Sequence, residues 1–263
     1  MTRLFNLAFA AYLAALVAAV IGMIRRGRTV ERVVYAFLAA GVLLLSAYMG
    51  VRWTEAGRAP FSNMFESLIL FGWAIPAIFL ALLHGVRIPG LSAATALSSV
   101  LTLAYASTFS AEIKPLMPAL QSNWLTFHVF SCFLGYGGFA VSFLASIGFL
   151  VVSRRASQAR KRSRAVLDTA MSQTISFGFL FLTVGIVTGS IWANSAWGSY
   201  WSWDPKETWS LITWLVYAAF LHCRYMRGWS GRRAAWISIV GFASVLFTYV
   251  GVNFLLSGLH SYA

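Results

Sequence analysis

Tryptophan and histidine are the residues of this chain best suited to binding chemistry. Six of the eleven tryptophans lie within residues 192–214. Four of them fall within 13 residues: Trp197, Trp201, Trp203 and Trp209. An aromatic belt at a membrane surface explains one or two tryptophans at a helix end, but it does not explain this density. Indole rings gathered in this way would form a broad, flat apolar surface, which suits a planar ligand with polar edges, such as a porphyrin.

The residues that surround these tryptophans predict a break between two helices. Residues 193–207 are called the tryptophan segment. Gly198 and the pair Asp204-Pro205 disfavour a continuous helix, so the tryptophan-rich part of this segment is expected to form a short loop or surface helix that leads into the seventh span. Pro205 suits the first turn of the next helix, with Asp204 as its N-cap and Glu207 near its positive end. We therefore expect Asp204 and Glu207 to cap a helix and not to act as acid or base catalysts.

Three of the four histidines are candidates for function. His128 follows Ser122-Asn123-Trp124 at the start of the fifth span, and His260 follows the eighth, so both are expected on the same side of a membrane as the tryptophan segment. Imidazole is a strong axial ligand of haem iron. His222 lies 14 residues after Thr208, or about 21 Å along a helix. An ionisable residue at that depth of a membrane is a candidate functional residue.

Composition predicts that the elements carrying these residues are membrane helices. Of the 263 residues, 59% are hydrophobic and 10% are charged, whereas soluble domains are about 25% charged. Apolar runs of about 20 residues cross a bilayer as helices. The runs are Leu4–Ile24, Val33–Val51, Ser67–Val86, Ile88–Ala111, Pro115–Ser153, Thr169–Trp203, Thr208–Cys223 and Ala234–Leu256. The chain is therefore expected to be an all-α polytopic bundle of about eight spans, forming one transmembrane domain over residues 1–263.

The distribution of Lys and Arg predicts the orientation. Alternate connections between the runs hold 15 of the 20 basic residues, and the side richer in Lys and Arg is normally cytoplasmic. Both termini and the tryptophan segment are then extracytoplasmic, in a multi-pass protein of the plasma (inner) membrane. The net charge of +13 is read as a topology and lipid-contact signal and not as nucleic-acid binding. Residues 153–164 are expected to form a cytoplasmic loop, and His84 to lie at the cytoplasmic interface.

The pattern W-G-x-x-W-x-W-D-x-K-E, from Trp197 to Glu207, resembles the tryptophan-rich WWD signature of haem-handling proteins. A longer match, which continues to Leu221-His222-x-Arg224, is similar to the CcsA (ResC) branch of the system II cytochrome c synthases. The resemblance extends from about Phe61 to the C-terminus, and the first two runs match only in hydropathy.

This resemblance implies a subunit of a holocytochrome c synthase that handles haem b. It implies that His128 and His260 ligate an outward-facing haem, and that His222 ligates a second haem whose opposite ligand comes from a CcsB (ResB) subunit. The implied haem-binding residues are His128, His260, His222, Trp197, Trp201, Trp203, Asp204 and Trp209. No catalytic residue separate from the iron ligands is implied. The implied partners are the CcsB-type subunit, the CxxCH segment of apocytochrome c and a thioredoxin-like thiol reductase.

Two other functions remain open at the level of sequence. A CcmC-type protein shares the tryptophan signature but delivers haem to a chaperone, and it would be shorter and lack the deep His222. A polytopic transporter or scaffold with an aromatic belt would bind no chromophore. Colour of the purified protein separates this last alternative from the others.

Overall fold

The computed structural model describes the chain except for residues 25–26, 86–87, 154–157, 257 and 259–263. Its described residues form helices, turns and loops without a strand. The chain divides into two compact units, Met1–Pro115 and Leu116–Ala263, and each is described by itself. The expectation of one domain over residues 1–263 stays a prediction, because it concerns how these two units combine.

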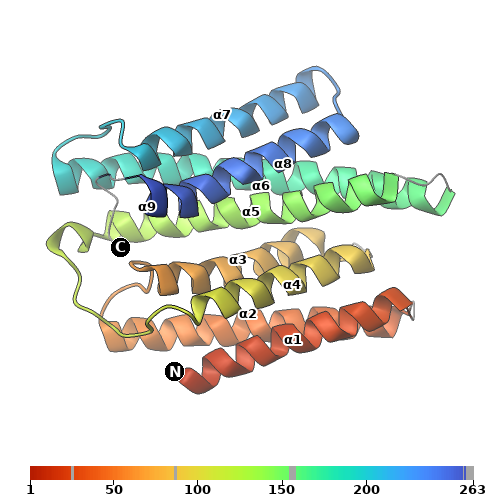
Figure 1. Ribbon diagram of the computed structural model, residues 1–263, viewed down its shortest axis with the longest axis horizontal. Helices are drawn as coiled ribbons and strands as arrows, with labels where there is room; N and C mark the ends of the chain where they lie inside the picture. Colours follow the sequence, from red (N-terminus) through yellow and green to blue (C-terminus); the bar gives the residue numbers. More distant parts are fainter. Residues whose placement is uncertain (25–26, 86–87, 154–157, 257, 259–263) are drawn as a thin grey trace. The chain divides into compact units, whose positions relative to one another are not determined.

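The described part of the first unit contains four helices (Figure 1): α1 (Thr2–Ile24), α2 (Arg28–Ala56), α3 (Met64–Leu83) and α4 (Pro89–Ala106). Helix α1 packs on α2 and α4, and α3 packs on the same two helices. Helix α4 ends at Ala106, before the end of its predicted run. The hydroxyls of Ser107 and Thr108 donate to the carbonyls of Ala104 and Tyr105, and such local bonds compete with helix continuation.

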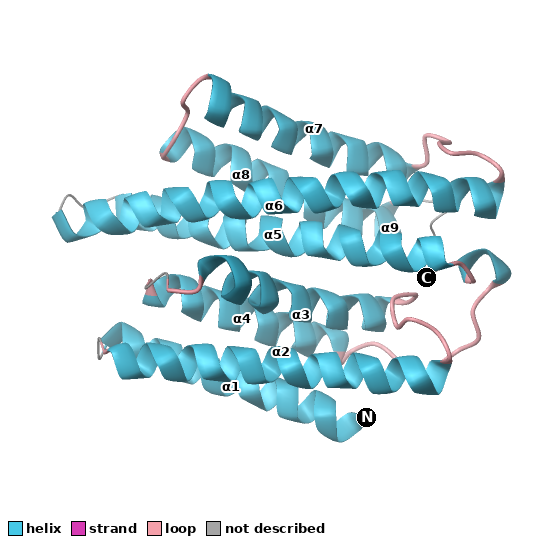
Figure 2. Cartoon of the chain, turned by 180° about the vertical axis from the view of Figure 1, so that it is seen from behind, coloured by secondary structure: helices cyan, strands magenta, loops and turns pink. Residues whose placement is uncertain are grey.

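The second unit holds the tryptophan segment. A 3₁₀ turn, η1 (Pro118–Leu120), precedes α5 (Asn123–Ser153), α6 (Gln158–Trp197), α7 (Pro205–Met226) and α8 (Arg232–Leu246). A π-helical turn, η2 (Phe247–Gly251), then leads to α9 (Val252–Leu255). The start of α5, the end of α6, the start of α7 and α9 all lie at one end of this unit (Figures 1 and 2). We call it the site end.

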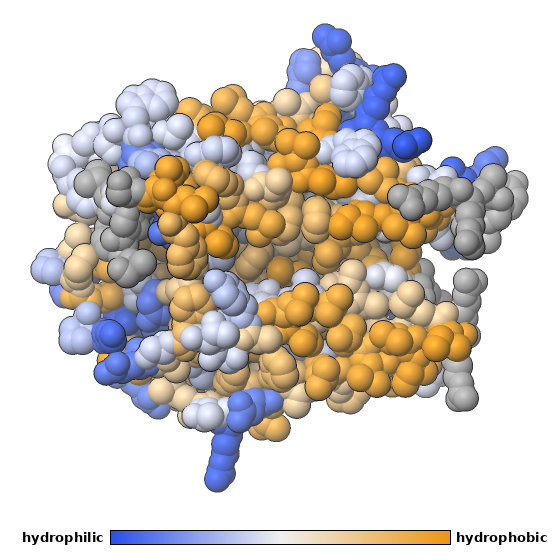
Figure 3. Space-filling model, in the orientation of Figure 1, coloured by the Kyte–Doolittle hydropathy of each residue, from blue (hydrophilic) through white to orange (hydrophobic). Residues whose placement is uncertain are grey.

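The helices confirm an all-α multi-pass fold. Within the described residues, six helical stretches are long and apolar enough to span a membrane: Thr2–Ile24, Arg28–Ala56, Met64–Leu83, Asn123–Ser153, Lys161–Trp197 and Arg232–Leu255. Helix α4 is apolar but shorter, and α7 is more polar because it carries Lys206, Glu207 and Arg224. On the face shown in Figure 3, hydrophobic residues cover the middle of the helices, and the most hydrophilic residues lie near helix ends. The direction in which the helices cross the membrane stays a prediction.

The charged run at the start of α6 corrects one expectation. Residues 153–164 were expected to form a loop, but residues 158–164 are helical and 154–157 lie outside the described residues. Gln, Ala, Arg and Lys are strong helix formers, so this part of the run extends α6 where a loop was expected. At the other end, α6 stops at Trp197, which confirms that the long run ending at Trp203 includes a loop.

Helices α5 and α6 touch along glycines. A Cβ atom on Gly135 would lie 3.0 Å from the carbonyl oxygen of Gly178, and one on Gly138 would lie 2.8 Å from that of Thr174. Small residues let backbones approach in this way in membrane proteins. The close contact brings the first turns of α5 against the last turns of α6, at the site end.

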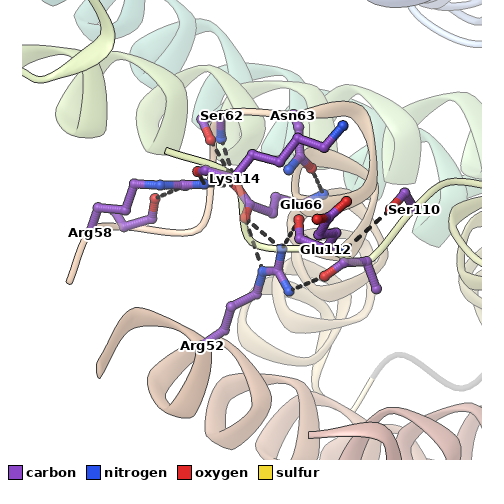
Figure 4. Close-up of polar contacts among 10 residues, drawn as sticks. Arg52, Arg58, Ser62, Asn63, Glu66, Ser110, Glu112 and Lys114 are labelled. Carbon is purple, nitrogen blue, oxygen red and sulfur yellow. Dashed lines mark hydrogen bonds and ion pairs between the residues drawn. The ribbon is translucent and has the colours of Figure 1, made fainter. Parts of the chain in front are cut away.

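A polar cluster is buried in the first unit (Figure 4). Asn63 caps α3 by accepting a bond from the Glu66 amide, 2.8 Å long. The Glu66 carboxylate accepts from Arg52 at 2.9 Å and from Arg58 at 3.1 Å. The backbone amide of Ser62 also donates to it, at 3.0 Å. Arg52 and Glu66 are each 1% exposed, so the ion pair is removed from water.

The two arginines also fix the chain that leaves α4. Arg52 donates to the carbonyl oxygen of Ala111 at 2.7 Å, and Arg58 donates to that of Lys114 at 3.2 Å. Glu66 therefore holds two guanidinium groups that in turn hold an extended segment. This cluster ties α2, α3 and the segment after α4 together.

Replacing Glu66 by glutamine is expected to destabilise the protein. Removing one partner of a buried ion pair leaves an uncompensated charge and costs roughly 3–5 kcal/mol, and here two arginines lose their carboxylate. Thermal unfolding in detergent should show a clearly lower midpoint for Glu66→Gln than for Glu55→Gln, since Glu55 is exposed. Equal midpoints for the two variants would show that the cluster contributes nothing to stability.

Candidate functional site

His128 lies near the start of α5 and contacts α6. Its Nδ1 is 2.7 Å from the carbonyl oxygen of Gly185. A carbonyl oxygen can only accept, so Nδ1 carries the proton and donates it. In the neutral ring the lone pair then belongs to Nε2, which is the arrangement that metal-binding histidines use. The predicted ligand is thus held in the form that a metal requires.

Trp192 of α6 stacks on His128. The two ring centroids are 6.1 Å apart and the planes differ by 14°. The indole is 1% exposed, and its Nε1 donates to the carbonyl oxygen of Ala119 at 2.9 Å. Sequence reasoning counted Trp192 among the dense tryptophans but assigned it no role. The signal that could have found it is its place at the site end of α6, opposite the start of the antiparallel α5.

The loop between α6 and α7 is held by the first turn of α7. Asp204 accepts a bond from the Lys206 amide at 2.9 Å. The Glu207 carboxylate accepts from the amides of Ser202 at 2.7 Å and Asp204 at 3.2 Å. These bonds form a capping box, which confirms that Asp204 and Glu207 act as helix caps.

The same carboxylate holds an unusual backbone. Trp203 has φ 61°, a left-handed conformation that is rare for a bulky residue and costs about 1–3 kcal/mol. Glu207 binds the amides on both sides of it, those of Ser202 and Asp204. Trp203 is 68% exposed, which leaves its indole available to a ligand.

The indoles do not form the single flat surface that was expected. Trp192 and Trp197 meet at 64° with centroids 4.7 Å apart, and Trp201 and Trp203 meet at 89° with centroids 5.7 Å apart. Aromatic rings favour such edge-to-face contacts because their faces are negative and their edges positive. Trp209 packs instead on Phe247, at 4.1 Å. The site end therefore offers two angled indole pairs.

The end of the chain reaches the same place. Gly258 lies so close to Asp204 and Pro205 that a Cβ atom on it would collide with the Asp204 carboxylate. Gly258 comes two residues before His260, which lies outside the described residues. The approach of Gly258 to the start of α7 requires glycine, and it brings the chain that leads to the second predicted ligand to the site end.

Lys206 adds a positive charge to the site end. It occupies the first turn of α7, before the predicted span that starts at Thr208. Burial lowers the pKa of Lys206 to about 8, against the opposing effect of the Asp204 carboxylate. The ammonium group therefore remains mostly charged at neutral pH.

A groove of about 650 Å³ opens beside Trp192. Its lining residues come from the segment before α5 and from the end of α6: Met117, Pro118, Ala119, Gln121, Ser122, Trp192, Ser195 and Ala196. Ligand sites in proteins commonly have volumes of about 300–1,000 Å³. The groove therefore has the size of a ligand site and shares Trp192 with His128.

The donor set fits a ligand that already carries a coordinated metal. Among the described residues, no group of three or more His, Cys, Asp or Glu side chains is placed to hold a metal ion. His128 instead offers one nitrogen beside aromatic rings. That combination suits the iron of a porphyrin, whose ring supplies four nitrogens and leaves axial positions for imidazole.

His222 lies away from this site, and His84 belongs to the first unit. His222 is exposed on α7, near the end opposite the site end. Beside it, Arg224 forms an ion pair of 2.7 Å with Asp168 of α6. His84 is exposed at the end of α3, in the first unit, with Nδ1 3.3 Å from the Ala81 carbonyl oxygen. The structure thus places His128, the tryptophan segment and Gly258 together and His222 apart.

Comparison with known proteins identifies the family. Residues 61–260 match the family model described as cytochrome C assembly protein. Relatives named cytochrome c biogenesis protein CcsA include one from Synechococcus elongatus, 41% identical over 86% of this chain and 85% of its own. Another, from Prochlorococcus marinus, is 39% identical over 88% of this chain and 84% of its own. One from Chlamydomonas reinhardtii is 43% identical over 84% of this chain and 65% of its own.

A solved structure shares the fold. The protein named cytochrome c haem lyase CcmF superposes with a TM-score of 0.67 at 20% identity, covering 98% of this chain and 46% of that chain. The sequence matches confirm the resemblance to the CcsA branch that the tryptophan segment indicated. The chain belongs to the cytochrome c assembly protein family.

Proposed function

We propose that this chain binds haem b at the site end of its second unit and presents it for covalent attachment to apocytochrome c. The observation that carries the proposal is the state of His128, whose Nδ1 is bound to the Gly185 carbonyl oxygen while Nε2 keeps its lone pair. The stacked Trp192 and the tryptophan segment lie at the same end of the unit. Relatives named for cytochrome c biogenesis support this assignment.

Each residue of the site has a role in this proposal. His128 binds the iron through Nε2, and His260 is the second axial ligand. Trp197, Trp201 and Trp203 contact the porphyrin ring. Lys206 offers its positive charge to the carboxylates of the porphyrin.

Attachment needs positioning more than acid–base catalysis. Each cysteine of the CxxCH segment adds its S–H across a vinyl group, so that one C–S and one C–H bond form and no electrons are lost. The chain contributes by holding the vinyl groups at a fixed place and angle. The histidine of the CxxCH segment then replaces one of the two axial ligands, and the product leaves.

Partner proteins would complete this function. His222 is exposed on α7, where a CcsB-type membrane subunit would supply the opposite ligand for a second haem. A thioredoxin-like reductase would keep the CxxCH thiols reduced. The site end faces the extracytoplasmic side of the plasma membrane, as the Lys and Arg distribution predicts.

The test is production of the chain together with a CcsB-type subunit, followed by absorption spectroscopy and an assay of attachment. We expect a Soret band in the purified protein and haem linked covalently to an apocytochrome with a CxxCH segment. An apocytochrome with SxxSH is the control and should stay unmodified. A colourless preparation that modifies neither apocytochrome would overturn the proposal and favour a scaffold or transporter.

A further inference from the structure

Two glycines of α6 make room for two side chains of α5. Gly185 and Gly189 are four residues apart and so lie on one face of the helix. A Cβ atom on Gly185 would lie 2.6 Å from Cys132 Sγ, and one on Gly189 would lie 2.5 Å from His128 Nδ1. His128 and Cys132 are themselves four residues apart. The imidazole thus occupies space that any residue larger than glycine at position 189 would fill.

Gly189 differs from Gly138, which lies deeper in the same helix pair. Gly138 faces backbone atoms of α6, since its Cβ would lie 2.8 Å from the Thr174 carbonyl oxygen. That contact serves helix packing. A Cβ atom on Gly189 would instead lie 2.5 Å from Nδ1 and 2.6 Å from Cε1 of the His128 ring. The absence of a side chain at Gly189 therefore serves the position of one imidazole.

The same face of α6 also supplies the bonding partner and the stacking ring. The Gly185 carbonyl oxygen accepts the Nδ1 proton at 2.7 Å, and Trp192, seven residues further on, lies parallel to the ring at 14°. The ring is thus confined by a bond on one edge, an indole on one face and a glycine against Nδ1 and Cε1. Figures 1 and 2 show α5 and α6 running side by side, as this arrangement requires.

We infer that the face of α6 formed by Gly185 and Gly189 is a positioning device that selects the Nδ1-protonated ring of His128 and aims its Nε2 at the iron. The inference rests on the proposed function and adds to it the residues that prepare the ligand. A carbonyl bond to the second nitrogen of a metal-binding histidine fixes its tautomer and orientation and strengthens it as a ligand. Gly185 and Gly189 touch neither haem nor substrate, so they are positioning residues.

The test is Gly189→Ala, measured by haem titration of the full chain with its partner subunit. Loss of such supporting contacts typically weakens metal binding by 10–100-fold, so we expect haem affinity to fall at least about tenfold and the Soret band to shift. Gly50→Ala is the matched control, because Gly50 is helical and has no atom within 4 Å of the added methyl. It should bind haem like the parent protein.

The Gly189→Ala substitution in a second protein, His128→Gly, shows whether Gly189 positions the imidazole or only allows the helices to pack. In His128→Gly with added imidazole, the ring that collides with the methyl group is free to move, so Gly189→Ala should have no further effect on haem binding. An equal loss in both backgrounds, or an unfolded double variant, would overturn the inference and assign Gly189 to helix packing. If the parent protein binds no haem at all, the proposed function itself fails.

Discussion

Replacing His128 by glycine is expected to remove most of the haem from the purified protein and to stop attachment to apocytochrome c. His128 provides the nitrogen held ready by the Gly185 carbonyl oxygen, and among the described residues no second histidine lies at the site end. Changes to the partners of metal ligands cost about 10–100-fold in affinity, so loss of the ligand itself should exceed roughly 100-fold. Soret absorbance per protein and haem transferred per hour measure the two effects.

Added imidazole should restore the Soret band of His128→Gly. The glycine leaves a space beside Trp192 that free imidazole fits, and the Gly185 carbonyl oxygen remains to bind it. His84→Gly is the matched control, since His84 is an exposed residue at the end of α3; it should keep its haem without imidazole. A His128→Gly variant that retains full haem would remove His128 from the site.

Much of the fold follows from the sequence because a membrane limits the choices. A chain that is 59% hydrophobic must satisfy its backbone within each segment, which leaves helices for runs that do not alternate. The helix ends were harder to predict, because they depend on local bonds. Ser107 and Thr108 stop α4 early, whereas the Arg and Lys residues before Thr169 extend α6. Hydropathy does not report either effect.

The site was predictable to the extent that it depends on residue type. Histidines and tryptophans near the ends of apolar runs pointed to one membrane face, and Asp204-Pro205 with Glu207 predicted a capped helix. What sequence could not supply was contact between helices. Trp192 and Gly189 acquire their roles only because α6 packs on α5. The angles between the indoles also depend on the loop conformation, which a positive φ at Trp203 sets.

Substitutions of Glu207 test whether its carboxylate serves the site by capping α7 or by acid–base catalysis. Its carboxylate accepts from the amides of Ser202 and Asp204 and from the Ser202 hydroxyl. Replacing Glu207 by alanine leaves these donors without their acceptor, at a cost of about 1–3 kcal/mol for each that stays buried. Trp203 then loses the bonds that hold its left-handed backbone. We expect Glu207→Ala to lose haem affinity and attachment activity while its helix content by circular dichroism stays near that of the parent.

Glu207→Gln decides between the two roles. A glutamine side-chain oxygen can still accept from the amides of Ser202 and Asp204, so the loop should keep its shape and most haem binding and attachment should survive. A carboxylate that transferred protons would instead make Glu207→Gln as inactive as Glu207→Ala. Glu55→Ala, at an exposed position, controls for loss of one negative charge. Since Oε2 of this carboxylate accepts three hydrogen bonds from its own loop, and the side-chain oxygen of glutamine can accept such bonds as well, the glutamine variant should hold Trp203 where a ligand can reach it and remain active.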